Sequence, residues 1–183
     1  MQIYLVHRWD GNPDSDWYPW LKKQLENKGI NIIIPKMPDN PEIDKWVGIL
    51  RKKVKNLDKN TYFIGHSIGC QTIMRYLQTL QDNIEIGGLI FVAGWFRLQN
   101  LEDEEVEEMV KPWLEDNIDF SKIKNKTKNI SAIFSTNDKY VDFEENSKLF
   151  RDKLNAKIIK IKDKGHFTSE DNIIELHEIL EEL

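Results

Sequence analysis

The sequence contains a serine with a glycine two positions before it and another two positions after it, between a predicted strand and a predicted helix. A nucleophilic serine can be presented by a sharp turn at such a junction. Ser67 lies in the run GHSIG at Gly65–Gly69, which follows the apolar stretch 61–64 and leads into a segment of helical period. Small residues two positions before and after the serine allow the turn, since a side chain there would collide across it. The free N–H groups at the start of the following helix point to the same place, where an oxyanion can form. The pattern of strand, turn and helix predicts a nucleophile elbow.

A serine hydroxyl is a poor nucleophile at neutral pH and needs an adjacent base. Two histidines follow Ser67 in the chain, and they lie in different settings. His166 lies in a glycine-containing loop directly after the last predicted strand, at the carboxyl edge of the sheet. His177 lies in the predicted C-terminal helix, where we expect a solvated surface residue. The sequence therefore predicts His166 as the base.

The acid that orients the histidine should follow the fifth predicted strand. In enzymes with a nucleophile elbow after a strand, the three catalytic residues follow along the chain in the order serine, acid, histidine. Asp138 comes first after that strand, in a turn-forming Asn-Asp pair. Asp142 precedes a helical segment and is explained by an N-cap role. Asp163 is close to His166 in sequence and is explained as a solvated turn residue. We predict Asp138 as the acid.

An oxyanion hole needs two N–H donors. One is predicted to be the backbone N–H of Ile68, and the other comes from the loop after the first strand, from Trp9 or Arg8. Trp9, Trp95 and Phe96 follow strands whose ends face the site, so these aromatic residues are candidates for an apolar substrate pocket. Aromatic residues at such places are also common in cores.

The segments that must position these residues are of two kinds, which alternate along the chain. Short apolar runs predict strands, and longer segments with helical periodicity predict helices. Predicted strands cover 3–7, 31–35, 61–64, 88–93, 130–135 and 157–161, and predicted helices cover 16–28, 42–56, 67–80, 143–154 and 171–183. This alternation predicts an α/β fold, with a parallel sheet of about six strands and helices on both faces. Ligands bind such sheets at the carboxyl ends of the strands.

One segment interrupts the alternation and is strongly acidic. Residues 101–119 carry apolar side chains at amphipathic spacing. One interpretation is a surface helix that docks its apolar face. The other is a small acidic cap, an insert over 97–120 across the mouth of the site. In either case the sequence predicts a single domain over 1–183.

Composition excludes several classes of protein. The 183 residues carry a net charge of −5, and Lys and Arg are scattered, which argues against a nucleic-acid partner. The single cysteine, Cys70, cannot form an internal disulfide, which favours a reducing compartment. No basic segment followed by a long apolar stretch opens the sequence, so neither export nor membrane insertion is expected. We expect a cytoplasmic location.

The two remaining histidines have no obvious catalytic task. His66 occupies the variable position of the elbow, between turn and sheet, and His7 is expected to orient the loop 8–10 by hydrogen bonding. Neither has a second metal ligand at i+2 or i+4, so no metal site is predicted. The loop after the first strand also lacks the glycine-rich pattern that cradles phosphates.

Several motifs together resemble the YdeN-like serine hydrolases, the group that includes the retinoblastoma-binding serine hydrolase. They are the stretches HRWDG, WYPWL, PKMP, GHSIG, NIDF, STND and GHF, spread over nearly the whole length. The resemblance implies a compact six-stranded α/β-hydrolase sheet, a Ser-Asp-His triad and no cofactor. Carried over by position, that triad falls on Ser67, Asp138 and His166.

One residue departs from the family pattern, because Arg8 replaces a glycine after the first strand. Arg8 either points to solvent or lies at the pocket mouth and favours a substrate that bears a carboxylate. A glycine there permits close backbone approach or positive φ, so the departure concerns the loop that supplies the second oxyanion donor.

The function expected from these residues is a serine hydrolase that cleaves a small or medium carboxylic ester, thioester or amide through an acyl-enzyme. Carboxylesterase chemistry is the leading expectation, with amidase or aminopeptidase activity possible. The alternative is a weakly active or inactive member of the fold that serves as a protein-binding module.

Overall fold

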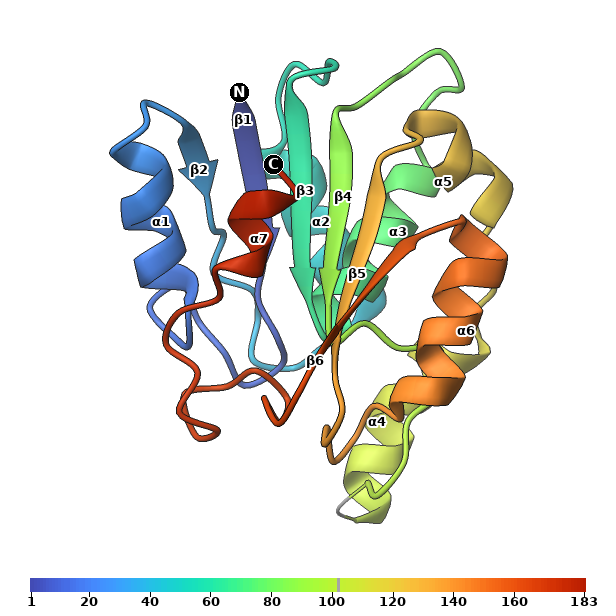
Figure 1. The fold of residues 1–183 in the computed structure, drawn as a ribbon. Helices are drawn as coiled ribbons and strands as arrows, with labels where there is room; N and C mark the ends of the chain where they lie inside the picture. The colour runs from blue at the N-terminus through green and yellow to red at the C-terminus, as the bar shows by residue number, and fades with distance from the viewer. Residues whose placement is uncertain (102) are drawn as a thin grey trace.

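The protein forms one parallel β-sheet with helices on both faces (Figure 1). The structure, a computed structural model, describes residues 1–101 and 103–183. The strand order is β2-β1-β3-β4-β5-β6, and each neighbouring pair is parallel. The strands are β1 (Gln2–Val6), β2 (Asn31–Ile33), β3 (Thr61–His66), β4 (Gly88–Val92), β5 (Ile130–Ser135) and β6 (Lys157–Ile161). The helices are α1 (Tyr18–Glu26), α2 (Ile43–Lys53), α3 (Ile68–Gln78), α4 (Glu104–Glu115), α5 (Phe120–Lys126), α6 (Phe143–Leu154) and α7 (Glu178–Glu181). The predicted α/β fold with six strands is confirmed.

Successive side chains of the central strands enter two separate hydrophobic cores. In β1, Ile3 and Leu5 point to the face covered by α1 and the C-terminal segment, whereas Tyr4 and Val6 point to the face covered by α2 and α3. All four are buried. Burial on both faces explains why these strands read as continuous apolar runs in the sequence.

The predicted C-terminal helix over 171–183 is wrong, because only Glu178–Glu181 is helical. The Asp171 carboxylate accepts hydrogen bonds from the backbone N–H groups of His166 and Thr168, which ties it to the preceding loop. Asn172 has a φ of 62°, in the left-handed region. Local side-chain and backbone bonds therefore hold a turn where the apolar spacing predicted a helix.

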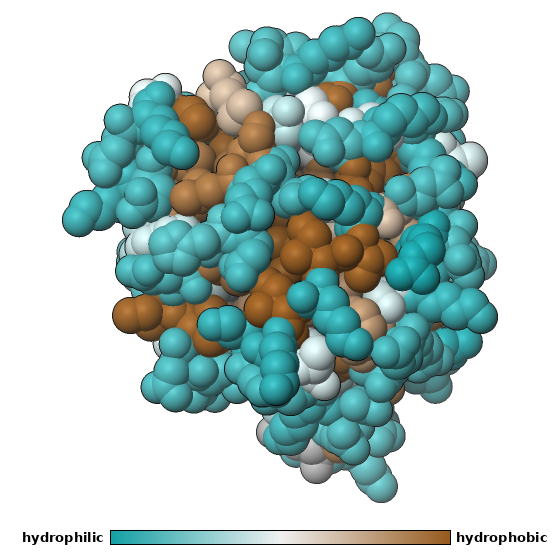
Figure 2. Space-filling view, viewed as in Figure 1, coloured by the Kyte–Doolittle hydropathy of each residue, from teal (hydrophilic) through white to brown (hydrophobic). Residues whose placement is uncertain are grey.

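The short α7 leaves part of its sheet face uncovered. Ile159 and Ile161 of β6 and Leu183 at the C-terminus are only partly buried against this core. Apolar side chains are accordingly visible on this face in Figure 2. No helix of the described residues is long and apolar enough to span a membrane.

All six strands point the same way, so their carboxyl ends form one edge, at the bottom of Figure 1. The loops after β1, β3, β4, β5 and β6 carry the residues that the sequence singled out. The acidic helix α4 lies below the same edge.

Candidate active site

The turn at Ser67 has the backbone geometry of a nucleophile elbow. Ser67 adopts φ 54° and ψ −119°, a combination that non-glycine residues rarely take, and its N–H donates to the Val92 carbonyl at 2.9 Å. The two glycines are required by close approach. A Cβ on Gly65 would lie 2.7 Å from Cα of Cys70, and one on Gly69 would lie 2.1 Å from the Val6 carbonyl oxygen. The first turn of α3 therefore packs directly on the end of β1.

A methyl group at Gly69 is expected to disrupt this packing. In Gly69→Ala the new Cβ meets the Val6 carbonyl, a backbone atom that cannot rotate away. We expect a loss of about 3 kcal/mol in the free energy of unfolding, as is typical of an overpacked site. Urea denaturation would measure it. Gly48→Ala, where a Cβ meets no atom within 4 Å, is the matched control.

His166 and Asp138 lie in direct contact. Nδ1 of His166 is 2.7 Å from Oδ2 of Asp138, and the Asp138 side chain is only 2% exposed. The other oxygen, Oδ1, accepts the backbone N–H groups of Tyr140 and Val141. With Asp138 ionised, Nδ1 of His166 carries the proton and Nε2 is left to accept one. By contrast, Asp142 caps α6 by accepting the N–H of Glu145, as predicted.

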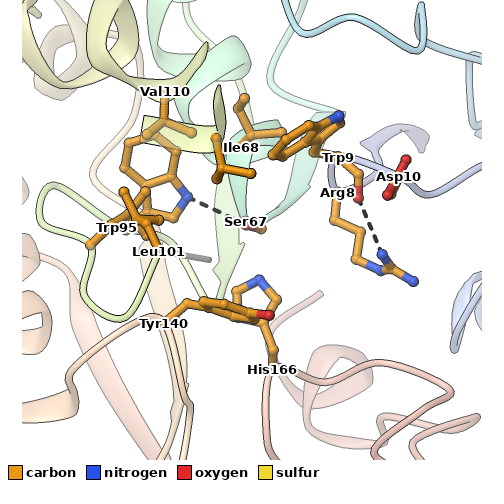
Figure 3. A pocket seen from close by; sticks show the side chains of 12 residues that line it. Arg8, Trp9, Asp10, Ser67, Ile68, Trp95, Leu101, Val110, Tyr140 and His166 are labelled. Atoms are coloured by element: carbon orange, nitrogen blue, oxygen red, sulfur yellow. Dashed lines mark hydrogen bonds between the residues drawn. The ribbon is translucent and has the colours of Figure 1, made fainter. Parts of the chain in front are cut away.

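Ser67 and His166 line the same pocket, a cavity of about 260 Å³ (Figure 3). The indole Nε1 of Trp95 donates to Oγ of Ser67 at 3.3 Å, and Trp95 forms one wall, as expected from the sequence. Between the described Ser67 and His166 side chains the structure records no hydrogen bond. Tyr140, which the sequence analysis did not assign to the pocket, also lines it. The Tyr140 and His166 rings make a T-shaped contact, with their centroids 5.5 Å apart. The place of Tyr140 beside Asp138 in the same loop was the available signal.

The two candidate oxyanion donors meet different partners. The Arg8 N–H donates to the Tyr18 hydroxyl at 3.2 Å, so it is not free for a substrate. Among the described residues, the N–H groups of Trp9 and Ile68 donate to no other group of the protein. Of the two alternatives in the first loop, Trp9 is therefore the better placed donor.

Arg8 does not point to solvent, so that interpretation is wrong. Its Nε lies 2.9 Å from Oδ2 of Asp16, and its side chain is 17% exposed. Arg8 does line the pocket, but its guanidinium is engaged by a buried carboxylate. Burial alone would raise the pKa of the Asp16 carboxyl, yet the Arg8 hydrogen bond and the surrounding donors bring it below its usual value.

Phe96, a candidate substrate-binding residue in the sequence analysis, does not line the pocket that Ser67 and His166 share. Its ring packs on Phe120 and Phe150, with centroids 5.3 and 4.6 Å away. The Phe96 N–H is held by Oδ1 of Asn146 on α6. The half-buried Phe96 ring therefore packs against the core beside α5 and α6, where it lines a second hollow with Trp113 and Phe120.

His66 makes contacts that the sequence could not reveal. The ring is fully buried, with Nδ1 2.7 Å from the Tyr18 hydroxyl and Nε2 2.8 Å from the His166 carbonyl oxygen. Burial, followed by the nearby His166, lowers the pKa of His66 to about 3. His66 is therefore neutral at neutral pH. His7 orients its loop as expected, with Nδ1 2.7 Å from the Arg8 carbonyl oxygen.

The low pKa of His66 predicts that the fold is less stable in mild acid. Below pH 6.5 the unfolded chain protonates this histidine and the folded protein does not, so the free energy of unfolding falls as pH falls. From pH 7 to pH 5 the loss from His66 is about 2 kcal/mol. Urea midpoints of the wild type and His66→Gln at both pH values would measure it. Equal pH dependence in the two proteins would contradict the assignment.

The acidic segment 101–119 contains helix α4, with residue 102 outside the described residues. Val106 and Val110 line the pocket together with Leu101, while the glutamates of the helix are exposed. Trp113, at the other end, donates from Nε1 to the Pro41 carbonyl oxygen at 2.6 Å. The helix docks its apolar face, and the same face meets the pocket.

Comparison with known proteins places the chain in a family. A profile of the serine hydrolase family matches residues 3–183. The chain is 30% identical to YdeN of Bacillus subtilis (strain 168) over 178 residues, 96% of this chain and 90% of that protein. It is also 30% identical to serine hydrolase RBBP9 of Rattus norvegicus over 168 residues, 90% of this chain and 82% of that one. The crystal structure of the B. subtilis ydeN gene product superposes with a TM-score of 0.88 at 28% identity, covering 98% of this chain and 95% of that one. The chain belongs to the serine hydrolase family.

Proposed function

We propose that this protein hydrolyses a small or medium carboxylic ester, thioester or amide through an acyl-enzyme on Ser67. His166 is the base and Asp138 the acid that orients it. The backbone N–H groups of Ile68 and Trp9 are the oxyanion donors. Carboxylesterase chemistry is the leading assignment. The observation that carries the proposal is the 2.7 Å contact of His166 with Asp138, beside the pocket that His166 shares with Ser67.

The proposed reaction follows from these positions. Oγ of Ser67 bonds to the substrate carbonyl carbon while its proton passes to Nε2 of His166. The oxyanion forms opposite the N–H groups of Ile68 and Trp9, each worth about 3 kcal/mol in such a site. When the intermediate collapses, the bond to the leaving group breaks and His166 protonates it. A water molecule, deprotonated by His166, then releases the acid and restores the Ser67 hydroxyl.

The apolar side of the pocket is proposed to hold the acyl group. Trp95, Leu98, Leu101, Val106 and Val110 meet there, and they carry no charge. Val106 and Val110 belong to α4, so we assign the acidic insert over 97–120 as a small cap within a single domain. The glutamates of α4 are exposed, so the outer face of the cap is solvated.

The test is turnover of p-nitrophenyl esters of increasing acyl length, beside an aminopeptidase substrate. We expect the wild type to hydrolyse the esters, with a limit on acyl length set by the cavity. Ser67→Ala should remove that activity without loss of stability. A folded wild type that turns over neither substrate class would favour the protein-binding alternative.

A further inference from the structure

We propose that four polar side chains behind the site, three of them buried, position the loop that carries Trp9 against the loop that carries His166. They are Arg8, Asp16, Tyr18 and His66, called here the buried polar cluster. They are positioning residues: apart from Arg8 none of them lines the pocket. The inference rests on the proposed function and adds a role for residues outside the triad.

The two loops need such a connection because of where they leave the sheet. Trp9 follows β1 and His166 follows β6. Strands β3, β4 and β5 lie between these two strands. An oxyanion donor and a base must nonetheless be held in a fixed relation, since small misplacements are costly in catalysis.

The first connection is a chain of hydrogen bonds with a defined direction. The His166 carbonyl oxygen can only accept, so Nε2 of His66 carries the proton and donates across 2.8 Å. Nδ1 of His66 must then accept from the Tyr18 hydroxyl, 2.7 Å away. The Tyr18 oxygen in turn accepts the Arg8 N–H at 3.2 Å. The residue before Trp9 is thus connected to the backbone of His166 through two buried side chains.

The second connection runs through Asp16. One carboxylate oxygen accepts from Nε of Arg8 at 2.9 Å, and the other accepts the Ser169 backbone N–H, also at 2.9 Å. The Asp16 side chain is fully buried, and its backbone adopts φ 53°. Because Ser169 lies three residues after His166, Asp16 joins the same two loops from the other side. Arg8, where the family pattern has glycine, supplies the side chain that this bridge requires.

The cluster also selects the oxyanion donor. The Tyr18 hydroxyl takes up the Arg8 N–H, whereas the next N–H along the chain, that of Trp9, donates to no protein group among the described residues. The Arg8 side chain closes the turn further, because Nη1 donates to the Trp9 carbonyl oxygen at 3.2 Å (Figure 3). The peptides before and after the one that carries the Trp9 N–H are therefore both held, which limits the orientations open to that N–H.

The test compares two tyrosines that lose the same group. Tyr18→Phe removes only the hydroxyl that connects Arg8 to His66. Tyr4→Phe is the matched control, because Tyr4 is also buried and its hydroxyl accepts a backbone N–H, that of Lys55, away from the pocket. Each variant would be measured for kcat and KM on the best p-nitrophenyl ester and for its urea midpoint.

We expect Tyr18→Phe to lower kcat about tenfold with little change in KM, because misplaced groups act on the chemical step. Tyr4→Phe should lose comparable stability and keep the wild-type kcat. Equal kcat in the two variants would overturn the proposal while leaving the triad intact. Asp16→Asn, which faces Arg8 with an amide instead of a carboxylate, should also lower kcat, and a wild-type kcat there would count against the second connection. An inactive wild type would instead reject the proposed function.

Discussion

Replacement of His166 by alanine is expected to lower kcat roughly 10⁴-fold or more while the protein stays folded. In the proposed mechanism Nε2 of this ring accepts the Ser67 proton, because Nδ1 is held by Asp138 at 2.7 Å. No other described histidine lines the pocket. Without the ring, Ser67 has no base, and only the oxyanion donors and substrate binding contribute. Steady-state turnover of the best ester would measure the loss.

His177→Ala is the matched control for this experiment. His177 is exposed, pairs with Glu175 and packs on Trp20, away from the pocket. Its replacement should leave kcat within about twofold of the wild type, as surface changes usually do. A His166→Ala protein that keeps more than about a tenth of wild-type kcat would reject His166 as the base.

Asp138→Asn is expected to lower kcat by roughly 10⁴-fold through a change of tautomer. The asparagine oxygen will keep the two backbone N–H groups of Tyr140 and Val141 that Oδ1 now accepts. Its NH₂ group must then face Nδ1 of His166, which becomes the acceptor. The histidine proton moves to Nε2, on the side of Ser67. With that proton in place, Nε2 cannot accept the proton of the Ser67 hydroxyl. KM should change little.

Asp142→Asn provides the comparison, because Asp142 caps α6, and among the described residues the structure records no hydrogen bond between it and His166. An asparagine is a good N-cap, so both stability and kcat should remain close to wild type. If Asp138→Asn and Asp142→Asn had the same kcat, Asp138 would not be the acid.

The sequence predicted the strands and the three candidate triad positions because both depend on local patterns. Apolar β-branched runs mark buried strands, and chain order places a serine, an aspartate and a histidine after three of them. The structure brings the aspartate and histidine into contact and sets the serine in the same pocket. The family assignment is confirmed independently.

The errors arose where tertiary contacts override local preference. The segment 171–177 has helical spacing, but Asp171 is bound to the loop at His166 and the chain turns at Asn172. Phe96 follows a strand that ends at the site, yet its ring packs on Phe120 and Phe150, outside the pocket of Ser67. Neither outcome can be read from spacing alone.

The buried polar cluster was out of reach for a further reason. It joins residues near positions 8, 16, 66 and 166, and no short motif connects them. His66 is an ordinary variable residue of the elbow in the sequence. Only the fold shows that its ring meets the backbone of His166.

The most direct test of the central claim is covalent labelling of Ser67 by a fluorophosphonate. The reagent bonds to an activated serine oxygen and releases fluoride, so labelling requires both the nucleophile and its base. The experiment can be done without knowing the natural substrate. We predict a single phosphonyl adduct on the peptide that contains Ser67 in the wild type, and none in Ser67→Ala. Correctly folded wild-type protein that remains unlabelled, or an adduct on another residue, would contradict the account.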